Sequence, residues 1–168
     1  AGLGAGLVVA SMARDLGGRV RILGTPAEEG GGGKIAMARN GAFASGVAAM
    51  MIHPADADLI KMDSIAVHTV DVTYEGKAAH AAAAPWEGRN ALDAAVLGYM
   101  NVAALRQHIR PTERIHGIIT EGGEKPNIVP RRAAATWYVR SNTISTLQPL
   151  KQRVLDCLEG ATSACGCA

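Results

Sequence analysis

Aromatic residues and surplus charge are both scarce in this sequence. Aromatics make up 4% of the 168 residues, and 17 basic residues stand against 15 acidic ones, for a net charge of +2. Without a clustered basic surplus, binding to nucleic acid or to an anionic membrane surface is not predicted. No apolar run reaches the roughly 20 residues of a membrane-spanning helix. The remaining composition, 48% hydrophobic and 19% charged, is that of a globular chain.

Cysteine is also rare, and the three cysteines, Cys157, Cys165 and Cys167, are crowded together. An odd number of clustered cysteines is not a disulfide framework, and a Cys-Gly-Cys pair offers only two ligands to a metal. Reduced thiols are typical of the cytosol or of an organelle matrix. We therefore expect a cytoplasmic protein.

Residues 1–64 alternate helix and strand patterns. A buried helix rich in Ala and Leu is predicted over 1–16, and a second helix over 34–40. Each is followed by a short apolar strand pattern, at 19–24 and 47–52. This alternation is typical of a parallel sheet with helices on both faces, so the segment is interpreted as part of an α/β catalytic domain.

The pattern changes at about residues 63–64. Residues 65–75 alternate strictly, which predicts a half-buried strand. A helix, two strands and a helix follow, at 87–108, 114–121, 131–140 and from Ser145 onward. This order predicts an α+β domain over 65–168, an antiparallel sheet backed by two helices. One more strand is expected beyond residue 168, so the chain is interpreted as an internal fragment.

Three finer predictions concern those helices. The first should pack through an apolar stripe of Leu92, Ala95, Val96, Tyr99 and Ala103. Ser145 followed by Gln148 is predicted to form the capping box of the second. Its inward face should consist of Leu150, Val154 and Leu158.

Glu28 and Glu29 directly follow the first strand pattern. Ligands of α/β sheets gather at the carboxyl ends of strands, so this position favours a site. Adjacent side chains diverge, which suits two tasks: one carboxylate binds a metal and the other moves a proton. The glycines at 30–33 would let the backbone turn sharply beside them. Two solvated glutamates before a flexible loop remain the alternative.

His53 ends the second strand pattern. Pro54 favours an extended backbone, which aims the ring beyond the strand end. Neighbouring strands would deliver Glu28, Glu29 and His53 to one edge, where a carboxylate and an imidazole suit zinc or manganese. Two ligands are too few for a complete site, so further ligands must come from elsewhere. A structural or exposed histidine is the alternative interpretation.

The glycine block does not predict a nucleotide site. A phosphate-binding loop that ends at Gly33-Lys34 needs a glycine at position 28 and Ser or Thr at position 35. The chain has Glu28 and Ile35 there, and two carboxylates would repel a phosphate. Nucleotide binding is therefore excluded.

Three polar residues of the second domain are candidates for ligand binding. His80 lies among small residues, which leave space for a ligand. Asn127 lies between Pro126 and Pro130, which stiffen its backbone. Arg140 ends a strand and offers a guanidinium fork that suits a carboxylate. Each of the three, taken singly, also has a structural interpretation.

The motifs together point to a family. They are Thr25-Pro26-Ala27-Glu28-Glu29-Gly30-Gly31-Gly32-Gly33-Lys34, His53, the segment 76–91, Asn127-Ile128-Val129-Pro130 and Arg140. In order and spacing this set resembles the aminoacylase and glutamate-carboxypeptidase family of metallohydrolases. The segment 76–130 is most similar to its Xaa-Arg dipeptidase branch, also described as β-alanyl-lysine dipeptidase. The similarity extends over nearly the whole chain.

The resemblance implies a catalytic α/β domain with two divalent metal ions, zinc with manganese or cobalt as alternatives. It also implies a lid domain that mediates homodimer formation. By this resemblance Glu28 is the general base that activates water. Glu29 is a ligand of one metal ion and His53 a ligand of the other.

The resemblance also implies roles for the lid residues. His80 would reach across the dimer to the scissile carbonyl or its oxyanion. Asn127 and Arg140 would hold the terminal carboxylate of a small dipeptide-like substrate.

The sequence departs from the family because it has no His-x-Asp and no Cys-Gly-His motif, which carry remaining metal ligands. Activity is therefore expected of the parent protein. The leading hypothesis is a metal-dependent dipeptidase for β-alanyl or γ-aminobutyryl conjugates of basic amino acids. An N-acyl amino acid or aminobenzoyl-glutamate amidohydrolase is a second hypothesis. A non-catalytic assembly module is a third.

Overall fold

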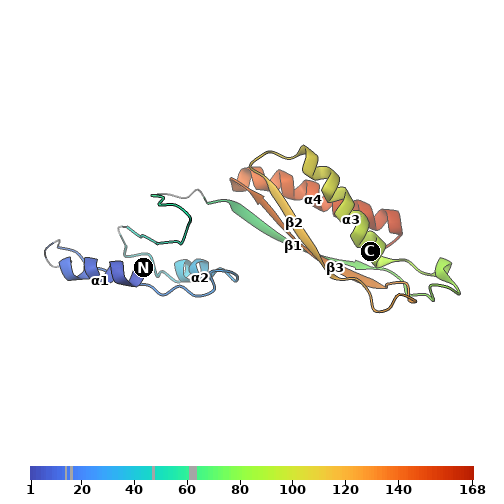
Figure 1. The fold of residues 1–168 in the computed structure, drawn as a ribbon, viewed down its shortest axis with the longest axis horizontal. Coiled ribbons are helices and arrows are strands. Elements are labelled where there is room, and N and C mark those ends of the chain that lie inside the picture. Colours follow the sequence, from blue (N-terminus) through green and yellow to red (C-terminus); the bar gives the residue numbers. More distant parts are fainter. Residues whose placement is uncertain (14, 16, 47, 61–63) are drawn as a thin grey trace. The chain divides into compact units, whose positions relative to one another are not determined.

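The computed structural model describes residues 1–13, 15, 17–46, 48–60 and 64–168. The chain divides into two compact units, Ala1–Ile60 and Lys61–Ala168 (Figure 1). Within the described ranges, no helix is both long enough and apolar enough to cross a membrane.

The first unit contains two helices, α1 (Gly2–Met12) and α2 (Gly33–Arg39). Helix α2 ends as its sequence predicts, because Gly41 adopts a φ of 77° just beyond the C-cap residue. The prediction that the first helix is buried was wrong, since α1 contains no buried residue. None of the described residues up to Ile60 is buried.

The two strands predicted in this unit are not formed. Residues 19–24 lie outside any strand, and so do residues 48–52, the part of the second pattern that the structure describes; Val47 lies outside the described residues. This corrects the prediction of a parallel sheet here. A parallel pair is stable only when both of its faces are covered, and the helices of this unit bury no apolar face.

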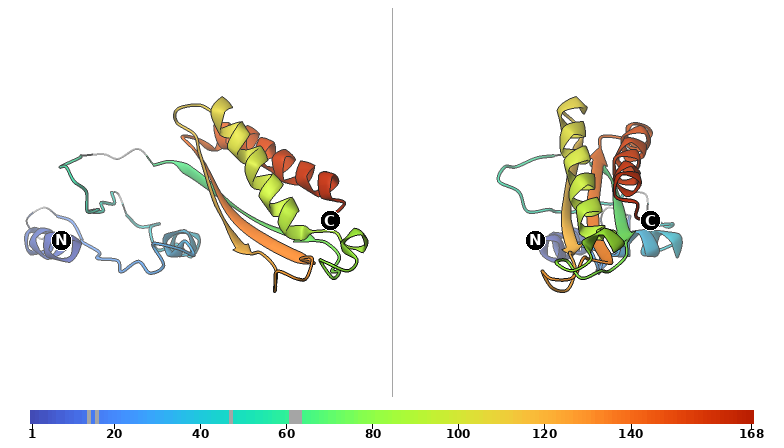
Figure 2. Two further views of the ribbon diagram at one scale, coloured as in Figure 1. Left: turned by 45° about the vertical axis from the view of Figure 1, so that its right-hand side comes forward. Right: turned by 90° about the vertical axis from the view of Figure 1, so that its right-hand side faces the viewer.

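The second unit is a three-stranded antiparallel sheet with two helices on one face (Figures 1 and 2). Its elements are β1 (Ala66–Glu75), α3 (Ala91–Leu105), β2 (Arg114–Glu121), β3 (Arg132–Ser141) and α4 (Ile144–Cys165). Single turns of 3-10 helix, η1 (Pro85–Glu87) and η2 (Arg106–His108), flank α3. The strand order is β1-β3-β2. The predicted α+β architecture is confirmed.

The core lies between the sheet and the helices. Alternate residues of β3 are buried toward the helices, namely Ala133, Ala135, Trp137 and Val139. Helix α4 buries Leu147, Leu150, Val154, Leu158 and Ala161, which includes all three residues predicted for its inward face. We call the opposite, uncovered face of the sheet the outer face.

Helix α3 packs through smaller residues than its sequence pattern suggested. Its buried residues are Ala91, Ala94, Ala95, Gly98, Val102 and Leu105. Of the predicted stripe, Val96 and Tyr99 are exposed. The reason is the close approach of α3 to β1: a Cβ atom at Gly98 would lie 2.5 Å from the buried Tyr74 hydroxyl.

Helix α4 begins earlier than predicted. Its N-cap is Thr143, which forms the capping box with Thr146 in place of Ser145 with Gln148. Strand β3 ends at Ser141, so the extended Thr143 is the first residue placed to cap the next helix.

Replacement of glycine by alanine should have opposite effects on stability at Gly98 and at Gly160. Gly98→Ala should lower the free energy of unfolding by about 1–3 kcal/mol, because the new methyl group overlaps Tyr74. Gly160 lies inside α4 with only Asn101 near its Cβ position, at 3.9 Å. Gly160→Ala should therefore raise that free energy by about 0.5–1 kcal/mol. Urea unfolding measures both changes in the free energy of unfolding. Changes of the same sign in the two variants would contradict this packing.

Tyr74 predicts how stability depends on alkaline pH. Burial, with a smaller contribution from the nearby Cys165, raises the pKa of the Tyr74 hydroxyl from 10.0 to about 12. The raised pKa favours the folded state below pH 10, and this advantage is lost as the pH rises. The free energy of unfolding should therefore fall by about 2 kcal/mol toward pH 12.

Tyr74→Phe is the matched test of that fall. The Tyr74 hydroxyl is buried and has no hydrogen-bond partner among the described residues, so its loss at pH 7 should change stability by less than about 1 kcal/mol. The variant should lack the part of the fall in the free energy of unfolding at alkaline pH that comes from Tyr74. Unfolding curves at pH 7 and pH 11 compare the two proteins, and an identical alkaline loss in both would contradict the assignment.

Candidate functional site

Glu28 and Glu29 lie in a tight loop before α2. The loop turns at residues 28–31, and Ala27, Gly31 and Gly32 have positive φ values of 54°, 83° and 62°. A side chain at Gly33 would clash with the Pro26 carbonyl, so the backbone there requires glycine. Both carboxylates are exposed. The glycine block therefore makes the sharp turn that its sequence predicted.

His53 is exposed, and the structure defines which of its nitrogens is free. Its Nδ1 atom lies 2.7 Å from the Pro54 carbonyl oxygen. A carbonyl only accepts hydrogen bonds, so Nδ1 carries the proton and the neutral ring has its lone pair on Nε2. A histidine oriented by a carbonyl in this way is suited to bind a metal through Nε2.

A complete metal site is not assembled within the described residues. They contain no group of three or more His, Cys, Asp or Glu side chains that could hold an ion. The donor chemistry of Glu29 and His53 fits zinc, but a zinc site needs about four ligands. The metal-binding roles of these two residues stay predictions.

His80 and Asn127 lie on adjacent segments. His80 forms an isolated β-bridge with Ile128, and the Ala81 amide donates to the Asn127 carbonyl oxygen at 3.0 Å. The Val129 amide donates to the Ala79 carbonyl oxygen at 2.9 Å. These backbone bonds clamp the two segments together. The structure thus brings together two of the three predicted lid residues.

The His80 ring is held in the tautomer opposite to that of His53. Its Nδ1 accepts from the backbone amides of Ala82 and Ala83, at 3.3 and 3.2 Å. In the neutral ring the proton is then on Nε2, which is a hydrogen-bond donor. A donor at this atom is what a carbonyl oxygen or an oxyanion requires.

Arg140 lies at the other end of the sheet. Glu75 at the end of β1 pairs with Arg132 at the start of β3, and the loops that carry His80 and Asn127 continue from there. The eight residue-to-residue steps from Arg132 to Arg140 extend about 26 Å along β3. One copy of the chain therefore does not present His80, Asn127 and Arg140 to the same small molecule.

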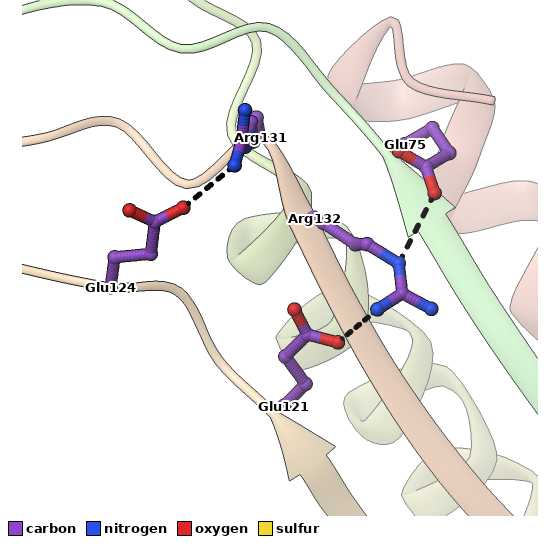
Figure 3. Close-up of polar contacts among 5 residues, drawn as sticks. All are labelled: Glu75, Glu121, Glu124, Arg131 and Arg132. Atoms are coloured by element: carbon purple, nitrogen blue, oxygen red, sulfur yellow. Dashed lines mark hydrogen bonds and ion pairs between the residues drawn. The ribbon is translucent and has the colours of Figure 1, made fainter.

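The Arg132 end of the outer face is electrostatically neutralised (Figure 3). The guanidinium of Arg132 bridges Glu75 on β1, at 3.3 Å, and Glu121 on β2. The neighbouring Arg131 pairs with Glu124 at 3.1 Å. The two exposed pairs of Arg132 join all three strands at this end of the sheet.

Arg114 is a further basic residue at the Arg140 end of the sheet, and it was not among the predicted site residues. It starts β2 and lies directly across from Arg140 in the β2–β3 register. The sequence did carry a signal, because two antiparallel strands joined by one loop place the start of the first opposite the end of the second. The predicted strands 114–121 and 131–140 therefore already implied that Arg114 and Arg140 are neighbours.

Known proteins share the sequence pattern of this architecture. Residues 66–163 match the family model described as the peptidase dimerisation domain. The chain is 49% identical over 149 residues to the Xaa-Arg dipeptidase of Mus musculus, covering 89% of this chain and 35% of that protein. It is 39% identical to one of the p-aminobenzoyl-glutamate hydrolase subunits of Escherichia coli, covering 86% and 31%.

A solved structure shows the same fold. The aminobenzoyl-glutamate utilization protein of Klebsiella pneumoniae matches with a TM-score of 0.56 and 26% identity, over 63% of this chain and 27% of that one. The chain spans about a third of the length of the curated relatives it matches. Since the family model covers more than half of its residues and its sheet has the matching architecture, the chain belongs to the peptidase dimerisation domain family.

Proposed function

We propose that this chain is part of a metal-dependent amidohydrolase that cleaves the amide bond of small dipeptide-like substrates. The observation that carries the proposal is the combination of a Glu28-Glu29 pair and His53 with a dimerisation unit whose relatives are named as dipeptidases and aminobenzoyl-glutamate hydrolases. The relatives are about three times as long as this chain, so the remaining metal ligands would lie outside it.

Each residue has a chemical task in this proposal. Glu29 and His53 would hold divalent ions, zinc or alternatively manganese or cobalt, which when bound lower the pKa of water. Glu28 would accept the proton of the attacking water as general base. The Nε2–H of His80 would donate to the scissile carbonyl oxygen as negative charge develops on it.

The substrate would carry a free carboxylate at one end. Asn127 supplies an exposed amide and Arg140 a guanidinium for that group. The similarity to Xaa-Arg dipeptidases favours β-alanyl or γ-aminobutyryl conjugates of basic amino acids. The similarity to p-aminobenzoyl-glutamate hydrolase favours an N-acyl amino acid or aminobenzoyl-glutamate as the second candidate.

We propose that the enzyme is a homodimer joined along β2. At its Glu75 end, the outer edge of β1 already exchanges two backbone hydrogen bonds with Ala168. The edge of β2 has no partner strand among the described residues. Helix α3 covers the same sheet (Figure 2). It exposes three neighbouring apolar residues, Val96, Leu97 and Met100, which we call its apolar flank. An unpaired edge and an apolar flank suit addition of a second sheet.

A two-fold dimer of this kind would complete the site. Two copies of β2 related by a two-fold axis run antiparallel, so the Arg114 end of one meets the Glu121 end of the other. The partner's His80 and the partner's Asn127 would then approach Arg140 of the first copy. The separation of these residues within one chain supports a site shared between two lids.

A non-catalytic assembly role is the alternative, favoured by the incomplete metal site. Metal analysis of the full-length protein together with an activity assay separates the two. A metal-free dimer without turnover would favour assembly alone.

Glu28→Gln tests the proposed base. In the full-length hydrolase this change should lower kcat by about two to four orders of magnitude, because the amide does not accept the proton. Metal content should stay at the wild-type level. Glu124→Gln, which alters an exposed carboxylate far from the loop of Glu28 in sequence, serves as the control and should keep normal turnover. Near-normal turnover of the Glu28 variant would remove the assignment.

Ile118→Lys tests the proposed interface. Ile118 lies on β2 and is 66% exposed, so a lysine does not disturb the monomer core. Near the two-fold axis the two lysines would face each other and repel. The dissociation constant of the dimer should therefore rise by about tenfold or more. Ile144→Lys, at a residue 70% exposed on α4, is the control. Sedimentation velocity measures both, and equal effects would contradict an interface along β2.

A further inference from the structure

The two ends of the outer face differ in charge balance. At one end, Arg132 is neutralised by two carboxylates. At the other end, Arg114 and Arg140 form no ion pair with any carboxylate among the described residues. Glu113, next to Arg114 in the chain, is engaged elsewhere, because it accepts from the Arg110 amide at 2.8 Å. Asp71 lies across from Thr136, four residues before Arg140 on β3, and accepts from the Thr136 hydroxyl at 2.7 Å.

Two like charges directly across a strand pair destabilise a sheet, yet here both side chains are held in place. Arg114 donates through one nitrogen to the carbonyl oxygens of Pro111 and Glu113. Arg140 lies over the Tyr138 ring, with 5.8 Å from its guanidinium carbon to the ring centroid. Its Nε atom is buried without a hydrogen-bond partner. The guanidinium of Arg140 donates to no described residue.

We propose that Arg114 and Arg140 together bind one carboxylate of the substrate, with Arg114 as a second carboxylate-binding arginine. The proposal rests on the proposed function and names a further residue of its substrate site. A bound carboxylate would separate the two positive charges and accept hydrogen bonds from both guanidinium groups.

A competing role for Arg114 is an ion pair with the partner's Glu121 in the dimer. Glu121 is already bound to Arg132 within its own chain, so its charge is compensated. Arg140 has no such compensation among the described residues. The charge balance therefore favours a carboxylate from outside the chain.

The test uses N-acetylglycine as a carboxylate probe and N-acetylglycinamide as its neutral counterpart. Titrations followed by NMR at the arginine Nε–Hε signals should show binding of the acid alone, with shifts at Arg114 and Arg140. Arg114→Met should weaken binding of the acid about tenfold, and Arg114→Lys, which keeps the charge, should weaken it less. Arg153→Met is the control, because Arg153 is also exposed and also donates to a carbonyl, that of His108.

Two results would overturn the proposal. They are absence of N-acetylglycine binding by the wild-type chain, and wild-type affinity for the probe in Arg114→Met, whether or not that variant still dimerises. In the full-length hydrolase, Arg114→Met should raise KM with kcat largely kept. If the wild-type protein binds the probe but hydrolyses no amide, the proposed function fails while the arginine site stands.

Discussion

Backbone hydrogen bonds on both sides of β3 fix which residues of the second unit enter the core and which lie on the outer face of the sheet. Strand β3 pairs with β1 along ten residues and with β2 on its other side. Its alternation then divides the strand into an inward row that ends in the core and an outward row of Arg132, Ala134, Thr136, Tyr138 and Arg140. A slip of one residue would bury both arginines and expose Trp137.

Packing on the inward face explains why that register is firm. Trp137 is 1% exposed and lies against Gly117 of β2, where any side chain would overlap its indole ring. Tyr99 packs against the same ring at a centroid distance of 5.5 Å, with the two ring planes tilted by 40°, and Arg106 lies over both aromatic rings. With so few aromatic residues in the chain, this one cluster holds α3 and two strands in place.

The sequence predicted the second unit well and the first unit poorly, for physical reasons. Alternation in 65–75 and the leucines of α4 report local amphipathicity, which is visible in sequence. The packing face of α3 was missed because Ala and Gly carry little hydrophobic signal, although they decide how closely a helix approaches. The strands predicted at 19–24 and 47–52 would need neighbours that cover both of their faces, and no local sequence pattern supplies those neighbours.

The candidate site was likewise predicted from the sequence only in part. Local contacts that orient His53 and His80 could not be read from sequence, because each depends on a turn that brings a backbone carbonyl or amide to the ring. The pairing of Arg114 with Arg140 was implied by strand order but needs the register to become certain. The residue types indicated which chemical groups the site contains, and the strand register showed which of those residues are neighbours.

In the proposed dimer, two copies of this chain share each site, one supplying His80 and the other Arg140. The most direct measurement mixes full-length His80→Ala and Arg140→Ala hydrolases after subunit exchange. Half of the dimers would be mixed, and each mixed dimer would contain one intact site, so about a quarter of wild-type activity should return. Activity that stays at the level of the separate variants would contradict a shared site.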